Sequence, residues 1–149
     1  MNEDEKWMSI AIIEAKKAEN EGEIPVGAVI INNNQIISKA HNQPILRNDP
    51  TAHAEVQAIR KAGKKQKNYR LVGSTLYVTL EPCMMCLGAI IHSRIQRVVY
   101  GAYDTKTGMC ESCEDLINSK VYNHEILLKG GVLEINCSEL LKSFFKLRR

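Results

Sequence analysis

The chain has 149 residues, of which 44% are hydrophobic and 25% charged, and its formal net charge is +3. This is the composition of an ordinary globular protein with room for one sizeable core. No apolar run approaches the length that spans a bilayer, and the acidic, amphipathic first segment is not typical of a signal peptide. We therefore expect a single domain over residues 1–149 that lies in the cytoplasm and not in a membrane.

Helices and strands are expected to alternate along the chain. Apolar residues at helical spacing predict the helices, and short β-branched runs predict the strands. In chain order, the expected elements are a helix over 4–20, a strand over 24–31, a turn at 32–34, a strand over 35–40, an irregular loop over 41–50, a helix over 51–65, a strand over 74–79, a helix over 84–92, a strand over 96–100, a short helix at 116–117, a strand over 132–135 and a helix over 139–147. Such alternation predicts an α/β fold with a layered sheet.

Basic residues are concentrated in two segments of this nearly neutral chain. No acidic residue lies between Glu55 and Glu81, whereas six lysines and arginines do. The second basic segment is the C-terminal end, with Lys142, Lys146, Arg148 and Arg149. Two basic segments suit a polyanionic partner such as nucleic acid. The alternative is a solvated helix face and a fraying terminus.

Two short fragments carry the candidate chemistry. They are His53-Ala54-Glu55 and, further along, Pro82-Cys83-x-x-Cys86. H-x-E followed by P-C-x-x-C is the signature of zinc deaminases that act on nucleobases. His53, Cys83 and Cys86 are ligands of the kind that a catalytic zinc site uses when it keeps a fourth position for water. The cysteine spacing puts both sulfurs on one helix face, where free backbone N–H groups favour thiolates.

Glu55 is expected to carry a proton rather than to bind the metal. Two residues beyond His53, it lies about 200° around a regular helix, which does not suit a second ligand on the same face. A carboxylate at the helix mouth can take a proton from water activated by the metal and deliver it elsewhere. Deamination needs such a proton transfer, because water attacks a ring carbon, a ring nitrogen is protonated and ammonia leaves.

The other cysteines leave alternatives open. The chain has five cysteines, an odd number, and no recognisable export signal. This indicates metal or redox chemistry rather than a disulfide framework. Cys110 and Cys113 form a second C-x-x-C pair, with 23 residues between it and the first. The two pairs also suit a four-cysteine structural zinc site in a non-catalytic RNA-binding module, for which Glu55 would have no role. A redox pair at Cys83 and Cys86 is a further alternative.

Seven segments of the chain resemble the bacterial tRNA-specific adenosine deaminases, the TadA family of the cytidine-deaminase-like superfamily. They are PVGAVI at 25–30, HN at 41–42, NDPTAHAE at 48–55, LEPCMMCLGAIIHSRI at 80–95, VVYGAYDTKTG at 98–108, YNH at 122–124 and FFKLRR at 144–149. H-x-E and P-C-x-x-C alone would also suit cytidine, cytosine, guanine and riboflavin-pathway deaminases. The IHSRI and D-x-K-T-G segments are more similar to the tRNA enzymes.

The resemblance implies a three-layer α/β/α, cytidine-deaminase-like fold with a five-stranded mixed sheet flanked by helices. It implies a homodimer with one zinc ion per subunit that converts adenosine to inosine at the wobble position of a tRNA anticodon, with the anticodon stem-loop as its partner. By the same resemblance His53, Cys83 and Cys86 would bind zinc and Glu55 would be the catalytic residue. The implied substrate-binding residues are Asn42, Ala54, Asp104, Asn123, His124, Arg148 and Arg149.

Residues 109–114, MCESCE, depart from the small residues that the family carries there. They put two thiols and extra negative charge near the expected RNA side, and an accessory metal or a reversible disulfide at Cys110 and Cys113 stays open. The alternative enzyme is a small-molecule deaminase of guanine or of a free nucleoside. Salt should hardly affect its substrate binding, whereas tRNA binding should weaken steeply with salt.

Overall fold

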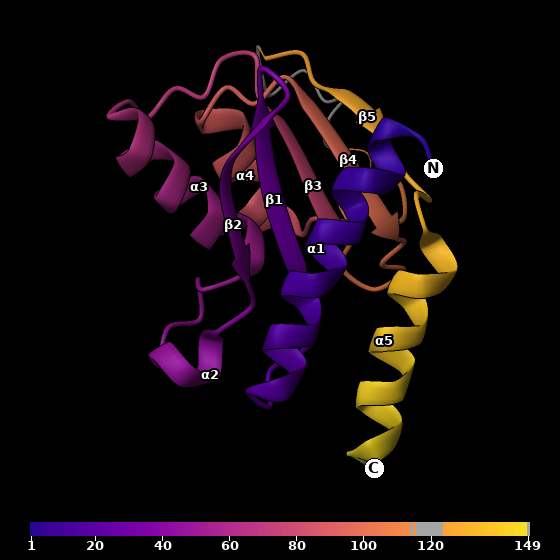
Figure 1. Cartoon of the computed structure of the whole chain (residues 1–149). Helices are drawn as coiled ribbons and strands as arrows, with labels where there is room; N and C mark the ends of the chain where they lie inside the picture. The colour runs from indigo at the N-terminus through magenta and orange to yellow at the C-terminus, as the bar shows by residue number, and fades with distance from the viewer. Residues whose placement is uncertain (114, 116–123, 149) are drawn as a thin grey trace.

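The computed structural model describes residues 1–113, 115 and 124–148. Its five strands form one sheet in the order β2-β1-β3-β4-β5 (Figure 1). The elements are α1 (Glu3–Asn20), β1 (Gly27–Asn32), β2 (Gln35–His41), α2 (Pro44–Arg47), α3 (Ala54–Gln66), β3 (Thr75–Leu80), α4 (Met84–His92), β4 (Arg97–Ala102), β5 (Leu127–Lys129) and α5 (Glu134–Leu147). Within the described part of the chain, no helix is long and apolar enough to cross a membrane.

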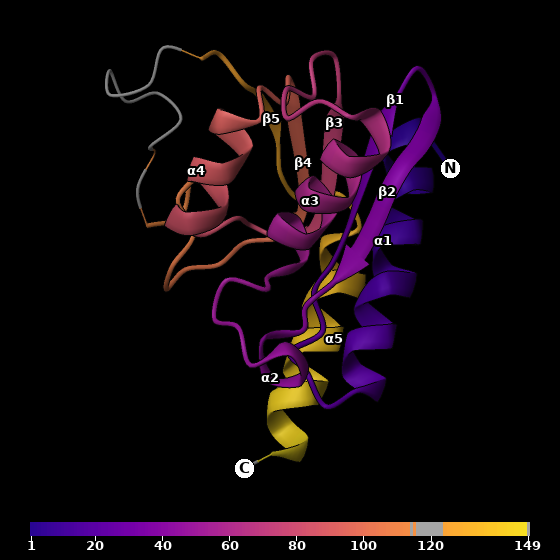
Figure 2. The same cartoon turned by 90° about the vertical axis from the view of Figure 1, so that its left-hand side faces the viewer.

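Helices cover both faces of the sheet, as the two views show (Figures 1 and 2). On one face α3 and α4 enclose a core that includes Leu76 and Leu87, and on the other α1 and α5 enclose a core that includes Trp7 and Tyr77. Alternate residues of β3 therefore point into different cores, as strand geometry requires. The predicted three-layer α/β/α fold is confirmed. The prediction of a single domain over 1–149 stays a prediction.

The strand directions bring the chain repeatedly to one edge of the sheet. β1 is antiparallel to both β2 and β3, whereas β3, β4 and β5 are parallel to one another. The carboxyl ends of β3 and β4 consequently lie side by side, and the helices α3 and α4 both begin near this edge (Figure 2). In open α/β sheets, ligands bind outside the carboxyl ends of the strands. This edge is where the candidate active site lies.

Most predicted elements are present, with shifted boundaries. The turn at 32–34 is confirmed, because Asn33 and Asn34 have φ of 50° and 61°, the left-handed conformation that tight hairpins use. β1 begins at Gly27 rather than at 24, and the loop over 41–50 contains the short helix α2. α3 begins at Ala54 rather than at 51, because the backbone of His53 is still extended at the N-cap position. The predicted helix at 116–117 lies outside the described residues.

The strand predicted over 132–135 is wrong. β5 is instead Leu127–Lys129, a three-residue edge strand whose residues are mostly exposed and therefore lack a buried apolar run. Gly131 and Leu133 have φ of 80° and 53°, so an extended strand does not continue through them. α5 then begins at Glu134 instead of 139.

An ion pair joins the start of α1 to the sheet. The carboxylate of Asp4 accepts two hydrogen bonds of 2.8 Å from the guanidinium of Arg97 and one of 2.8 Å from the hydroxyl of Tyr77. These bonds, that of Arg97 above all, hold the pKa of Asp4 well below its usual range although burial opposes them. Because Arg97 begins β4, this ion pair lies at the other end of that strand from the candidate site.

We predict that Asp4→Asn lowers the free energy of unfolding by about 1–3 kcal/mol at neutral pH, the order expected for a mostly buried, hydrogen-bonded charge pair. The pKa of Asp4 is lower in the folded state than its ordinary value of 3.8. Its contribution is therefore present above that value and is lost as the pH falls through the folded-state pKa. Denaturant unfolding at a series of pH values measures the difference, which should shrink in acid.

The control is Glu3→Gln, which removes an exposed carboxylate from the same first turn of α1. It should change stability by no more than about 0.5 kcal/mol. Equal losses in the two variants would show that the charge of the helix start, and not the pair with Arg97, is what matters.

Candidate active site

Two helix starts bring three possible metal ligands together. His53 and Cys83 occupy the N-cap positions of α3 and α4, each with an extended backbone, and Cys86 lies in the first turn of α4. Their ligand atoms all lie within 4.8 Å of one another, and Nδ1 of His53 is 3.7 Å from Sγ of Cys83 and 3.4 Å from Sγ of Cys86. Nitrogen and sulfur ligands of a tetrahedral zinc ion are about 3.6 Å apart. The donor atoms are thus spaced to hold one zinc ion.

One of these three side chains is held in its deprotonated form. The thiol of Cys86 donates a hydrogen bond to Cys83, and this bond, with the contact to His53, lowers the pKa of Cys83 to about 4. The same bond and burial raise the pKa of Cys86. The hydrogen bond with Cys83 raises the pKa of His53. Cys83 is therefore a thiolate at neutral pH, the form that binds metal.

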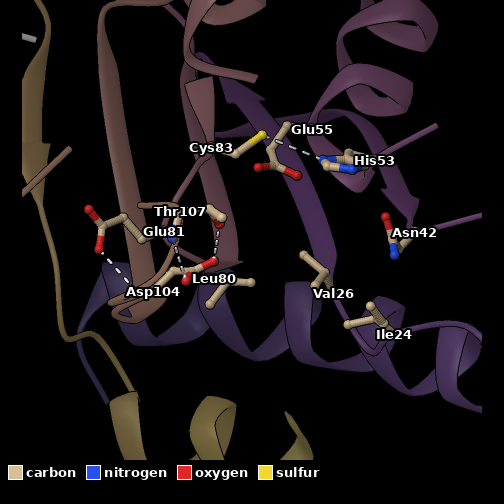
Figure 3. A pocket seen from close by; sticks show the side chains of 10 residues that line it. All are labelled: Ile24, Val26, Asn42, His53, Glu55, Leu80, Glu81, Cys83, Asp104 and Thr107. Atoms are coloured by element: carbon tan, nitrogen blue, oxygen red, sulfur yellow. Dashed lines mark hydrogen bonds between the residues drawn. The ribbon is translucent and has the colours of Figure 1, made fainter. Parts of the chain in front are cut away.

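A pocket opens beside His53 and Cys83 (Figure 3). Its lining combines polar side chains with an apolar wall formed by Ile24, Val26 and Leu80. Asn42 is 7% exposed and directs its side-chain amide into the pocket. Within the described part of the chain, that amide forms no hydrogen bond of its own. It is therefore available to orient a ligand.

Glu55 lies in the first turn of α3, between His53 and Cys83 as seen from the pocket (Figure 3). Its side chain is buried, with 5% exposure, and it contacts the thiol of Cys86. Burial raises the pKa of Glu55 to about 7. A carboxyl group whose pKa is near neutral both accepts and releases a proton readily at physiological pH. Its position and its pKa suit the proton-carrying role that the sequence predicts.

Asp104 is a second predicted residue that lines the pocket. Its carboxylate accepts hydrogen bonds of 3.0 Å from the backbone N–H groups of Lys106 and Thr107, and one of 2.7 Å from the Thr107 hydroxyl. These bonds close a tight turn, which fixes the side chain in place at the rim (Figure 3). The role of Asp104 toward a substrate stays a prediction.

Three other predicted residues do not line the pocket. The methyl group of Ala54 is fully buried in the core between the sheet and α3. His124 donates a 2.7 Å hydrogen bond to the carbonyl of Ile95, just before β4 and away from the pocket edge. The guanidinium of Arg148 lies 3.5 Å over the ring of Phe144. The predicted residues Asn123 and Arg149 lie outside the described residues.

The second cysteine pair takes no part in the site. Cys110 is fully buried in the core, whereas Cys113 is exposed and donates to the carbonyl of Thr105 at 3.0 Å. In residues 1–113, 115 and 124–148, no four-cysteine group comes within metal-binding reach. Glu111 is directed inward, where it accepts a hydrogen bond from the hydroxyl of Tyr100. The structure therefore does not support the four-cysteine alternative.

Sequence reasoning missed two polar residues of the pocket lining, Glu81 and Thr107. The sequence indicated Thr107 indirectly, since it belongs to the D-x-K-T-G segment, whose first residue, Asp104, is a predicted substrate-binding residue. The sequence indicated Glu81 more weakly, because it is an acidic residue that follows an apolar strand and directly precedes Pro82. Its 2% exposure was not visible in the sequence.

Comparison with known proteins agrees with this geometry. Residues 1–102 match the cytidine and deoxycytidylate deaminase zinc-binding region. A tRNA-specific adenosine deaminase of Haemophilus influenzae is 51% identical over 147 residues, which cover 98% of this chain and 85% of that protein. The chain belongs to the tRNA-specific adenosine deaminase family.

Two solved structures extend the comparison. One comes from studies of A-to-I editing by tRNA:A34 deaminases at the wobble position of transfer RNA. It has a TM-score of 0.89 and 39% identity, and the match covers 91% of this chain and 99% of that one. The other is the guanine deaminase of Bacillus subtilis, with a TM-score of 0.66, 46% identity and coverage of 70% and 67%. The match to the tRNA deaminase is the more complete of the two.

We predict that Cys86→Ala lowers the zinc content of the purified protein from one ion per chain to well below half, because two protein donors remain where three are needed. The control is a double variant, Cys110→Ala with Cys113→Ser, which removes the same type of donor outside the site. It should keep one zinc ion per chain. Elemental analysis after dialysis measures both, and loss of zinc from the double variant alone would favour a four-cysteine site.

Proposed function

We propose that this protein converts adenosine to inosine at the wobble position of a tRNA anticodon, and that His53, Cys83 and Cys86 bind the zinc ion that the reaction needs. One observation carries the proposal: three correctly spaced donors lie beside a buried carboxyl, Glu55, at the bottom of an open pocket. The membership of the chain in the tRNA-specific adenosine deaminases supports it.

The chemistry follows from the placement of these side chains. When bound, zinc lowers the pKa of a water molecule towards ~7 and so supplies a nucleophile near neutral pH. Glu55 takes a proton from the water and delivers it to the ring nitrogen next to the carbon that bears the amino group. A second proton transfer by Glu55 lets the amino group leave as ammonia, so that adenosine and water become inosine and ammonia. Asn42 holds the edge of the purine, and the apolar wall packs on its face.

The surroundings of the pocket favour RNA over a free base. A second hollow continues from the pocket and shares Asp104 and Thr107 with it. Its lining includes Lys106 and two aromatic residues, Tyr103 and Phe145, which are 40% and 46% exposed. Exposed rings and a lysine suit stacked bases and a phosphate of a single strand. A wobble base can leave its stack at low cost to enter such a pocket.

We further propose that the enzyme acts as a homodimer in the cytoplasm. The exposed apolar side chains of Met84 and Met85 on α4, 59% and 36% exposed, suit a protein interface. The cytoplasmic location stays a prediction from the sequence. Sedimentation equilibrium tests the oligomeric state, and a monomer at micromolar concentration would overturn the dimer.

We predict that Glu55→Gln lowers the rate of inosine formation on an anticodon stem-loop by roughly 10²–10⁴-fold, the usual contribution of a general acid–base group. The amide keeps the shape of the side chain but carries no exchangeable proton of suitable pKa. The variant should keep one zinc ion per chain, which excludes loss of the metal as the cause. Single-turnover assays with mapping of inosine measure the effect, and full activity would contradict the mechanism.

The same assay separates the two candidate substrates. Wild-type protein should form inosine in tRNA, and its KM should rise steeply between 50 and 200 mM salt because phosphate contacts are screened. Guanine is the alternative, since the chain also matches a guanine deaminase. Deamination of free guanine without any inosine in tRNA would overturn the substrate assignment.

A further inference from the structure

The loop over residues 104–113 is wrapped around one buried side chain, that of Glu81. Its carboxylate is 2% exposed and lies between the end of β3 and this loop. It accepts hydrogen bonds from the loop: from backbone N–H groups of Asp104 at 3.1 Å, Cys110 at 3.1 Å, Glu111 at 2.8 Å and Ser112 at 2.9 Å, and from the Ser112 hydroxyl. Five donors from one loop thus meet on a single carboxylate.

The two oxygens of Glu81 have different partners. Oε2 accepts the three consecutive N–H groups of residues 110–112, and Oε1 accepts the Asp104 N–H and the Ser112 hydroxyl. Successive N–H groups that converge on one anion form a backbone nest. Both oxygens must therefore be acceptors, and an amide in this position would turn an N–H₂ group toward N–H donors.

Gly108 shows how closely the loop fits the carboxylate. A Cβ atom at this position would lie 2.5 Å from Cδ of Glu81 and 2.5 Å from the carbonyl oxygen of Asp104. The next residue, Met109, donates from its backbone to the carbonyl of Pro82 at 3.0 Å. The glycine thus lets the loop approach both Glu81 and the residue that follows it.

The anchored loop forms one side of the candidate active site. Asp104 and Thr107, both in this loop, line the pocket opposite His53 and Asn42 (Figure 3). Glu81 stands two residues before Cys83, but its carboxylate is directed away from Cys83 and toward the loop (Figure 3). One residue consequently joins the metal-binding helix start to the opposite wall of the pocket.

We propose that Glu81 is a positioning residue, which sets the place of the 104–113 loop relative to the metal centre and thereby determines how well the RNA substrate binds. The proposal rests on the proposed function. Glu81 acts through the loop and not on the reacting atoms. Its loss should therefore weaken binding more than it slows the chemical step.

The test is Glu81→Gln, assayed on an anticodon stem-loop with zinc content measured on the same sample. We expect KM to rise about tenfold or more, since several hydrogen bonds to a charged group are lost, while kcat stays within about threefold and zinc is retained. The control is Asp4→Asn, which removes a hydrogen-bonded carboxylate at the other end of β4 and should lower stability without changing KM. A purely structural role would make the two variants alike.

Gly108→Ala tests the same contact without altering the carboxylate, and it keeps the proposal testable if Glu81→Gln does not fold. The added methyl group should displace the loop and raise KM as the first variant does. Unchanged KM in both variants would overturn the proposal. Loss of zinc and of kcat at unchanged KM would overturn it too, because Glu81 would then serve the metal ligands.

Amide hydrogen exchange separates this proposal from the proposed function. The backbone amides of residues 110–112 should exchange slowly in the wild-type protein and in Asp4→Asn, and much faster in Glu81→Gln. Inactivity of the wild type on tRNA would refute the function while leaving this comparison intact. Slow exchange in Glu81→Gln would refute the anchoring role whatever the substrate is.

Discussion

The active-site edge depends on one constraint: three donor atoms from two separate helix starts have to meet within bonding distance of one ion. The parallel pair β3 and β4 makes this possible, because it places the start of α4 directly beyond the end of β3. α3 packs beside α4 on the same face of the sheet and begins at the same edge (Figure 2). The caps of these helices, His53 and Cys83, are therefore brought together by the fold itself.

Two buried carboxyl groups at this edge have opposite surroundings, and we propose different roles for them. Burial raises the pKa of Glu55 to about 7, and few hydrogen bonds oppose it. Burial also acts on Glu81, but the hydrogen bonds of the Ser112 hydroxyl and of the loop N–H groups outweigh it, so the pKa of Glu81 is lowered. One group is thus prepared to exchange a proton, and the other stays charged and holds a loop. Environments that separate the pKa values of neighbouring carboxyls often assign their roles.

Local sequence patterns predicted the candidate metal centre better than they predicted the strand and the loop around it. Cys83 and Cys86 are three residues apart, and His53 and Glu55 are two residues apart. Each motif can therefore be read from a few neighbouring residues of the sequence. The fifth strand was missed because β5 is short and exposed and is defined by its pairing with β4, which no local pattern reveals. The contacts of Glu81 were missed for the same reason, since its partners lie 23 to 31 residues further along the chain.

X-ray absorption at the zinc edge of the purified protein tests the central claim most directly. The account predicts a first shell of two sulfur atoms, one imidazole nitrogen and one light atom from solvent, because the donors are Cys83, Cys86 and His53. Cys110→Ala with Cys113→Ser should leave that spectrum unchanged. A shell of four sulfur atoms, or one that changes in this double variant, would contradict the account.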